Sequence, residues 1–493
     1  MMSPQWKKAK SLNAQTLQRR LKKEKKREKK LAQAAIRAQK AKKTELIYQI
    51  YTTITHHFPE LFDWMREIDD PRKKASQFEL AAHLTACLAM FIFKAGSRNE
   101  YNQKRKDLQF QKNFKKLFGF PMPHGDSTHN VIELLNEAQV EQLNQKMVQV
   151  LLKRKVFYKS RYRSHWYRIA VDGTGVVSFD HHHCEQCLHQ TSKNGITTYS
   201  HKVLDARLVT PNGFSISIAS EWIENPENDE YDKQDCERKA FTRLAAKLKK
   251  IYPRLPIIIL ADALYPYEGF FTICKTNGWA YLVTFKNGNL PTVWEEVLAL
   301  KPRQAKNLYT EIFYSSDGNK KTEQFFCWVD QIDYKGHKVN WQECCETVTT
   351  TQKNADGSVE VIKIEEKHFV HITNLPLNKK NIAASSYTGR LRWKIENEGF
   401  NTLKNGGYGL EHKWARKSYQ ALKNYFQFMQ MGYLINQLLV KSTVFQETFM
   451  EDKDHPTLQS LWKDLDAAMK WAKVKLARLA EISATRIQFR FIS

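Results

Sequence analysis

Two aspartates each end a short apolar run that is typical of a buried β-strand. Asp172 ends the run YRIAVD and is followed by Gly173, whose lack of a side chain admits close approach of another backbone. Asp262 ends the run IIILAD. Carboxylates in such places point out of the edge of a sheet, and hard divalent cations such as Mg²⁺ bind oxygen ligands. The two aspartates therefore predict a magnesium site.

A third carboxylate comes from a predicted helix that begins near residue 390. Arg392, Glu396 and Lys404 fall on one broad face of it, because successive residues of an α-helix are turned by about 100°. A carboxylate between two cations suits a metal ligand with phosphate groups bound beside it. Glu398 is the alternative to Glu396. The predicted metal ligands and catalytic residues are Asp172, Asp262 and Glu396.

Several motifs in this part of the chain resemble the DDE transposases of bacterial insertion sequences. The matching subgroup has a β-strand insertion and a helical Y-x2-R-x3-E-x6-K signature, and RWKIE at 392–396 matches its R-x3-E part. The run IENEGFNTLKNGGYGLEH resembles a signature of one branch, as do VDGTG at 171–175 and KQDCE at 233–237. The resemblance covers about residues 165–440, and the set is specific because the motifs occur in this order around a β-rich segment.

This resemblance implies metal-dependent DNA strand cleavage and strand transfer, the cut-and-paste transposition of an insertion sequence. Such phosphoryl transfer uses two Mg²⁺ or Mn²⁺ ions roughly 3.5–4 Å apart, which activate the attacking oxygen and stabilise the leaving oxygen. The implied partners are double-stranded DNA, as terminal inverted repeats and target DNA, and a second copy of the chain in a paired-end homodimer. The implied location is the bacterial cytoplasm, at the nucleoid. The residues implied to contact DNA are Tyr387, Arg390, Arg392 and Lys404.

The spacing departs from the family signature in two places. The tyrosine should stand three residues before Arg392, but Gly389 is there and Tyr387 lies two residues earlier. The lysine comes one residue late, at Lys404. Pairing Tyr387 with Arg390 restores the tyrosine spacing but loses that of the glutamate. The roles of Tyr387 and Lys404 therefore stay open.

Residues 180–189 read DHHHCEQCLH and hold two cysteines at the C-x2-C spacing of zinc ligands. A structural Zn²⁺ would pin this loop beside the predicted active site. The alternative is a polar hairpin loop with free thiols, because a single C-x2-C is a modest signal. The candidate ligands are Cys184, Cys187, His183 and His189, with His201 as a further partner.

The elements around these residues predict an α/β RNase H-like core, a mixed sheet flanked by helices. Strands at 167–171, 199–209 and 214–222 come first, with an Asn212-Gly213 turn between the last two. Then follow a helix at 232–250, a buried strand at 257–260, a helix at 267–277, a strand at 279–285 and a helix at 291–300. Three antiparallel strands followed by alternating helix and strand is the order of an RNase H-like fold.

An all-β insertion and an N-terminal all-α domain complete the predicted organisation. The predicted parts are a basic, disordered arm (1–43), a helical DNA-binding domain (44–160), the core (161–303 and 376–445), the β-rich insertion (304–375) and a C-terminal helical region (446–493). The arm is a candidate DNA-binding segment, and the alternative is a solvated tail. For the helical domain the alternative to DNA binding is a helical scaffold with a solvated basic face. Adjacent Cys344 and Cys345 in the insertion predict strand packing, with side chains on opposite faces.

The family resemblance also implies that the insertion shapes a site for a flipped base during hairpin formation. Trp294, Trp328 and Trp341 are candidates to stack on such a base, and the alternative for each is a place in the core. Helices at 461–476 are candidate dimer-interface elements.

Charge is the strongest bulk signal in the 493-residue chain, which is long enough for two to four domains. Its 78 Lys+Arg exceed its 52 Asp+Glu, and of the net +26 the first 43 residues carry +14. Such a balance favours phosphate backbones as partners. The eight scattered cysteines indicate a reducing compartment, and the sequence shows no signal peptide or apolar span, so we expect a soluble intracellular protein.

Two alternatives to a transposase remain at this point. One is a non-transposing RNase H-like nuclease, against which the basic N-terminal region and the insertion argue. The other is a degenerate transposase that acts as a DNA-binding protein, which the three intact carboxylates disfavour. Strand-transfer assays discriminate the first, and metal-dependent nicking discriminates the second.

Overall fold

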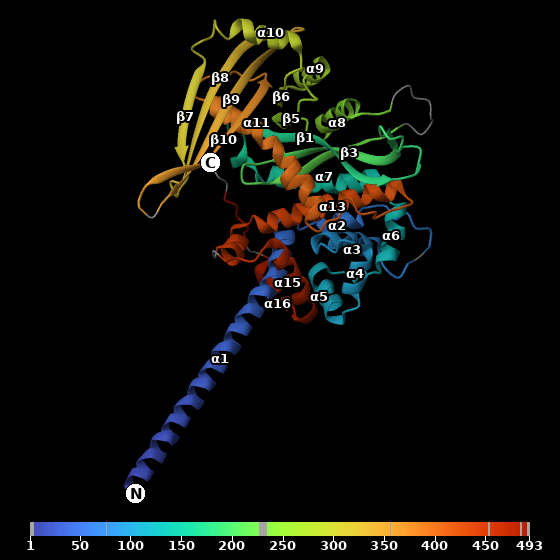
Figure 1. Ribbon diagram of the computed structural model, residues 1–493. Helices are drawn as coiled ribbons and strands as arrows, with labels where there is room; N and C mark the ends of the chain where they lie inside the picture. The colour runs from blue at the N-terminus through green and yellow to red at the C-terminus, as the bar shows by residue number, and fades with distance from the viewer. Residues whose placement is uncertain are drawn as a thin grey trace.

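A mixed sheet of ten strands crosses the protein, with helices packed on it and a large helical region below it in the view of Figure 1. The computed structural model describes residues 4–490 except 75, 226–233, 355, 452–453 and 484–485, and side chains from residue 22 onward. The protein is thus a mixed α/β protein with an N-terminal helical region.

The first half of the sheet is antiparallel. β1 pairs with β3, and the other edge of β3 pairs with β4 and with the short β2. The predicted turn between β3 and β4 is confirmed: Gly213 has a φ of 83°, which favours glycine, and its N–H donates to the Thr210 carbonyl. The four strands are β1 (Tyr167–Phe179), β2 (Leu188–Thr191), β3 (Thr197–Val209) and β4 (Ser215–Ile223).

Two parallel strands continue the sheet on the other side of β1. β5 pairs with β1, and β6 pairs with β5. All five residues of β5 are buried, as is typical of a parallel strand covered on both faces. The helix predicted from residue 232 begins at Glu237, and residues 232–233 lie outside the described residues. The elements are α8 (Glu237–Ile251), β5 (Ile257–Ala261), α9 (Glu268–Asn277), β6 (Ala280–Thr284) and α10 (Pro291–Leu300).

Four long antiparallel strands form the β-rich insertion, at the upper left of Figure 1. The end of β10 pairs with β6, from His371 opposite Thr284 to Thr373 opposite Leu282. The insertion therefore extends the main sheet and is not a separate layer. Cys344 is buried and Cys345 is exposed, which confirms that they point to opposite faces. The strands are β7 (Leu308–Tyr314), β8 (Lys320–Tyr334), β9 (His337–Lys353) and β10 (Val359–Thr373).

The helical region combines both ends of the chain around α13. This helix contacts α3, α6 and α7, and its residues are almost all buried. The apolar face of α15, around Leu461 and Leu465, is buried in the same chain, where α15 contacts α1 and α5. The helices are α1 (Pro4–His57), α2 (Leu61–Arg66), α3 (Leu80–Ile92), α4 (Arg98–Arg105), α5 (Leu108–Phe118), α6 (Gly125–Leu134), α7 (Glu137–Lys153), α13 (Tyr419–Val440), α14 (Thr443–Phe445), α15 (Leu458–Trp471) and α16 (Leu476–Ile482).

The basic N-terminal arm is part of α1, a helix of 54 residues that projects from the body (Figure 1). Side chains of residues 22–42 are exposed, whereas Leu46, Ile47 and Ile50 are buried in the helical region. The arm is thus helical from Pro4 onward, where disorder was expected. Among the described helices, none is both long enough and apolar enough to cross a membrane.

Candidate active site

The pairing of β1 with β5 places Asp172 and Asp262 at the same level of the sheet. Ala170 pairs with Leu260 in parallel register, and each aspartate lies two residues beyond its member of that pair. Residues two apart on a strand point to the same face. Asp262 Oδ1 accepts a hydrogen bond of 2.8 Å from the Leu264 N–H, which fixes the turn after β5.

The strand that carries Asp172 is longer than predicted. β1 does not end at Asp172 but continues to Phe179, because it stays paired with β3 after its pairing with β5 ends at Ala170. Asp172 thus lies where β1 loses one neighbour, and Asp262 follows the end of that neighbour. The non-local pairing with β3, rather than a strand end, positions this carboxylate.

Glu396 reaches the aspartates from a helical segment whose pitch changes. Arg392 Nη1 donates to Asp172 Oδ2 at 3.0 Å and to Glu396 Oε1 at 2.8 Å, so one guanidinium joins the strand to the helix. Glu398 instead forms an ion pair of 2.7 Å with Lys394, and the geometry favours Glu396 as the third carboxylate. The segment consists of α11 (Ile382–Arg390), a 3-10 turn η2 (Leu391–Trp393), a π-helix η3 (Ile395–Asn401) and α12 (Thr402–Asn405).

The crowding of carboxylates changes the acidity of Asp172. Burial raises the pKa of Asp172, Arg392 lowers it, and the neighbouring Glu396 and Asp262 raise it, so that together they bring it to about 7. Burial has the largest effect on this pKa, because the ionised carboxylate loses its bound water and a single guanidinium does not replace it. A strongly raised pKa beside converging carboxylates is typical of a functional site.

Glu237, at the start of α8, is a fourth carboxylate that the sequence analysis did not select. A Cβ added to Gly173 would lie 2.5 Å from Glu237 Oε1, so this side chain occupies the room that the glycine leaves. Burial and the charge of Asp262 raise the pKa of Glu237, and Lys202 lowers it. The only sequence signal was its place in KQDCE, which is part of the resemblance.

Tyr265 lies behind these carboxylates. Its hydroxyl is buried, and it has no hydrogen-bond partner in the part of the chain that the structure describes. Burial raises the pKa of Tyr265 well above its usual value, and the charges of Glu237 and Asp172 add to the rise. The phenol therefore stays protonated and can donate a hydrogen bond toward the cluster.

Of the four residues predicted to contact DNA, the structure brings only Arg392 to the carboxylates. Arg390 forms an ion pair of 2.7 Å with Glu346 of β9, and Lys404 forms one of 2.8 Å with Glu411. Tyr387 is 48% exposed, so its ring is open to a partner. The π-turn accounts for the position of Lys404, because it rotates residues beyond Glu396 away from the face that a regular helix predicts.

The missing signature tyrosine has a steric cause. A Cβ added to Gly389 would lie 2.5 Å from Nε2 of His371, a buried residue of β10. Burial and the nearby Arg390 and Arg392 lower the pKa of His371 to about 3, so the imidazole stays neutral. Gly389 thus lets the helix pack directly on the sheet.

A buried ion pair supports the π-helix from below. Arg207 donates to Asp205 at 2.7 Å, and both side chains are fully buried. A Cβ on Gly399 of η3 would lie 3.0 Å from Arg207 Nε, so the helix rests on the guanidinium. This contact sets the height of the helix that carries Glu396 above the sheet.

The three tryptophans proposed to stack on a base are packed within the protein. Trp328 and Trp341 are buried, and Trp294 packs on Phe285 with ring centroids 5.0 Å apart. Trp393 is different: it is 52% exposed and lies next to Arg392, whose guanidinium carbon is 5.3 Å from the ring centre. The sequence analysis did not select it.

The His/Cys loop also gathers into one cluster. His183, Cys184, Cys187 and His201 offer ligand atoms that all lie within 4.8 Å of one another. His189 is not among them; its backbone N–H and carbonyl bind the Gln234 side chain instead. His201, on β3, therefore takes the place given to His189.

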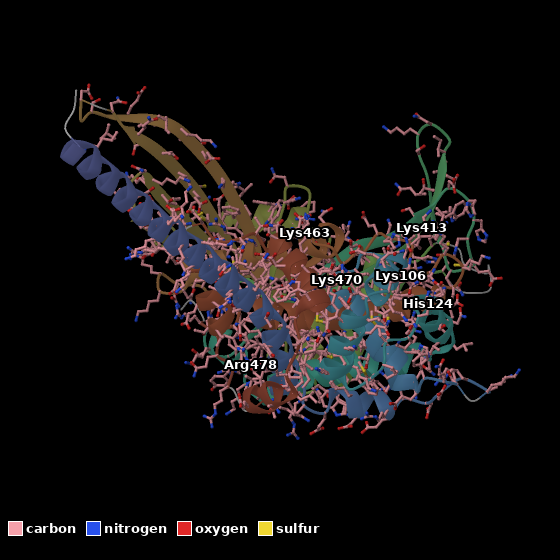
Figure 2. The ribbon with its side chains drawn as sticks, turned by 90° about the horizontal axis from the view of Figure 1, so that it is seen from below. Lys106, His124, Lys413, Lys463, Lys470 and Arg478 are labelled. Carbon is pink, nitrogen blue, oxygen red and sulfur yellow. The ribbon has the colours of Figure 1, made fainter. Side chains whose placement is uncertain are left out.

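Basic side chains are distributed over the helical region. Figure 2 shows Lys463, Lys470 and Arg478 on α15 and α16 and, farther from α1, Lys106 and Lys413. A cleft of about 530 Å³ on this region is lined by Ser97, Arg98, Asn99, Asn102, Asp126, His412, Lys413 and Arg416.

Comparison with known proteins adds no assignment: neither a family model nor a curated protein matches the chain.

Proposed function

We propose that the protein is a DNA transposase of the DDE kind, which cleaves and joins DNA strands with the help of divalent metal ions. The observation that carries the proposal is the convergence of Asp172, Asp262 and Glu396 from two strands and a helix. Oxygen ligands that meet in this way suit Mg²⁺ or Mn²⁺.

We further propose that the core of the sheet is RNase H-like. The strand order β4-β3-β1-β5-β6 supports this proposal. β4, β3 and β1 pair antiparallel to one another, and β5 and β6 run parallel to β1. In this arrangement Asp172 lies on the central strand, β1, and Asp262 follows the end of its neighbour β5. The insertion then extends the same sheet from β6.

The proposed ligands of two Mg²⁺ or Mn²⁺ ions are Asp172, Asp262 and Glu396, with Glu237 as a further ligand or as an acceptor for a bound water. Such ions activate an attacking water or hydroxyl and stabilise the leaving oxygen. Arg392 neutralises part of the carboxylate charge before metal binds. Once cations take over that role, its guanidinium is free to contact a phosphate, for which its planar fork of donors is suited.

The DNA partner is supported by charge and by exposed rings near the site. The net charge of +26 gives a field that attracts a polyanion. The exposed Trp393 offers a flat surface beside Arg392 on which an unpaired base could stack, and Tyr387 is a second exposed ring on the same helical segment. We propose terminal repeats and target DNA as substrates, held by a homodimer in the bacterial cytoplasm.

The test is strand cleavage and strand transfer on DNA that carries the sequences bracketing the gene, with Mg²⁺, Mn²⁺ or neither. We expect metal-dependent nicking and joined products from the wild type, and neither from Asp262→Asn. Asp333→Asn, an exposed aspartate of the β8–β9 hairpin, is the matched control and should retain activity. Metal-dependent nicking without joining would identify a nuclease, and DNA binding without nicking would identify a binding protein.

A further inference from the structure

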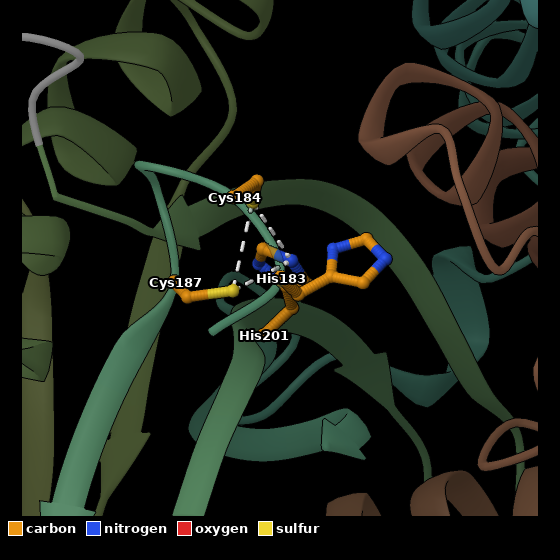
Figure 3. A group of neighbouring side chains, drawn as sticks. All are labelled: His183, Cys184, Cys187 and His201. Atoms are coloured by element: carbon orange, nitrogen blue, oxygen red, sulfur yellow. Dashed lines mark hydrogen bonds between the residues drawn. The ribbon is translucent and has the colours of Figure 1, made fainter. Parts of the chain in front are cut away.

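We propose that His183, Cys184, Cys187 and His201 form a structural zinc site that ties the β1–β2 loop to β3 and to the start of α13 (Figure 3). The site is separate from the carboxylate cluster and goes beyond the proposed activity. Thiolate and imidazole are the ligands that Zn²⁺ takes in closed structural sites.

The distances within the cluster match the edges of a tetrahedron around a zinc ion. Sγ of Cys184 lies 3.6 Å from Sγ of Cys187, and the two sulfurs lie 3.4 and 3.5 Å from Nε2 of His201. With Zn–S bonds of about 2.3 Å and Zn–N bonds of about 2.05 Å, tetrahedral ligands stand about 3.8 Å apart for two sulfurs and about 3.5 Å for sulfur and nitrogen. Three corners are therefore already in place.

His183 supplies the fourth corner. Its Nε2 donates to the backbone carbonyl of Arg416, while its Nδ1 is buried and has no partner among the described residues. Histidines that bind metal usually donate their other ring N–H to a carbonyl or carboxylate, which fixes the tautomer. Because the other three ligand pairs lie at 3.6 Å or less, His183 is the residue that moves inward on binding.

One side of the cluster is buried against aromatic rings, whereas His183 and Cys184 are half-buried. His201 is fully buried and stacks on Tyr419 of α13, with centroids 4.0 Å apart and planes at 15°. His183 stacks on Phe179 in the same way, at 4.0 Å and 12°. Four protein ligands leave no open position, so the site suits a structural ion.

Zinc here would hold three distant parts of the chain together. Cys184 and Cys187 belong to the β1–β2 loop and His201 to β3, and the Arg416 carbonyl precedes α13. The segment before α13 continues directly from α12, at the end of the helix that carries Glu396. An ion in this place would therefore also anchor the path from the Glu396 helix into the helical region.

The test is the zinc content of the full chain, purified without a histidine tag and dialysed against a weak chelator. We expect about one zinc per chain in the wild type and none in Cys184→Ser or Cys187→Ser. Cys236→Ser, an exposed cysteine, and His189→Asn are the matched controls and should keep the metal. X-ray absorption at the zinc edge should show two sulfur and two nitrogen neighbours.

Because a cysteine variant can fail to fold, the decisive measurements are made on the wild type. Two results together would overturn the proposal. The wild type would contain no zinc after expression in zinc-supplemented medium, and a thiol reagent would titrate both cysteines freely in the native state. Zinc in full amount but with an oxygen-only shell would also overturn it, since the ion would then lie at the carboxylates. Neither measurement depends on DNA cleavage, so the test of the zinc site is independent of the proposed function.

Discussion

Asp172 and Asp205 are direct partners on neighbouring strands, and each has an arginine within 3.0 Å. Their environments differ in the degree of burial and in the other charged groups nearby. Asp205 is fully buried, where it accepts from Arg207 at 2.7 Å and from the Ser217 hydroxyl at 2.6 Å. Asp172 shares its arginine with Glu396 and faces the charge of Asp262.

The difference separates a balanced buried ion pair from a cluster with excess negative charge. Around Asp205 one positive and one negative charge balance, and Arg207 satisfies its remaining donors with Ser215 and Gln430. Around Asp172 two carboxylates share Arg392 and Asp262 lies nearby, so a negative charge remains. A buried excess of negative charge costs stability, and a bound cation relieves that cost.

The largest expected effect is on catalysis. Asp172→Asn should reduce strand cleavage by at least about 10³-fold, or more than about 4 kcal/mol in barrier height, because a metal ligand is lost. DNA binding in a gel-shift assay should stay close to that of the wild type, and the thermal midpoint should not fall. Retained cleavage by the pure variant would contradict the catalytic role.

The complementary change is Asp205→Asn, which should act on the fold. Removing one partner of a buried ion pair leaves Arg207 uncompensated and costs about 3–5 kcal/mol in the free energy of unfolding. Urea denaturation measures it, with Asp333→Asn as a control that should leave the midpoint unchanged. An Asp205→Asn protein as stable as the wild type would remove the contrast between the two pairs.

Glu237→Gln should give an intermediate effect on activity. We expect about a 10- to 100-fold loss of cleavage, the range typical of residues that support metal ligands, and a higher Mg²⁺ concentration for half-maximal rate. Gly173→Ala should act through the same side chain, because its Cβ would displace Glu237. The double variant should therefore lose less than the product of the two single effects. Fully independent effects would separate the two residues.

The smallest effect concerns pH and stability. The pKa of Asp172 is about 7 in the folded protein, well above the usual value of an aspartate, so the folded state holds this proton more tightly than the unfolded state. Without metal, the contribution of Asp172 to stability is therefore highest at low pH and is lost as pH rises from about 4 to above 7. Asp172→Asn should gain about 1–2 kcal/mol relative to the wild type between pH 5 and pH 8. Mg²⁺ should stabilise the wild type at pH 8 more than the variant, and an equal response would count against metal binding here.

The alternation of short strands and helices was sufficient to predict the sheet elements and two of the carboxylates. Each of the predicted strands at 199–209, 257–260 and 279–285 has a counterpart in β3, β5 and β6. A short apolar run such as IIILA predicts a buried strand without information from distant residues. Asp262 directly follows β5, and the same kind of apolar run precedes Asp172, although β1 continues past it.

The remaining features depend on contacts between distant residues. β1 continues past Asp172 because β3 pairs with it, and the GTG that follows gives no local signal of this. The position of Lys404 depends on a π-turn that helix periodicity does not reveal. His201 joins the cysteines only because β3 returns alongside β1, whereas His189 is nearer in sequence.

The projecting part of α1 has a consequence that follows from its charge per unit length. Residues 22–43 hold eleven Lys/Arg and two Glu, a net +9, along about 33 Å of helix at about 1.5 Å per residue. The helix thus carries about one net charge every 4 Å. In water the repulsion between two unit charges equals the thermal energy at about 7 Å, so neighbouring charges on this helix repel more strongly than that. A rod of this kind collects a sheath of small anions, as a duplex collects cations. When this helix binds DNA, as we propose, the counterions of both are released. We therefore expect the binding to be driven by the entropy of the released ions and to weaken steeply as salt is added.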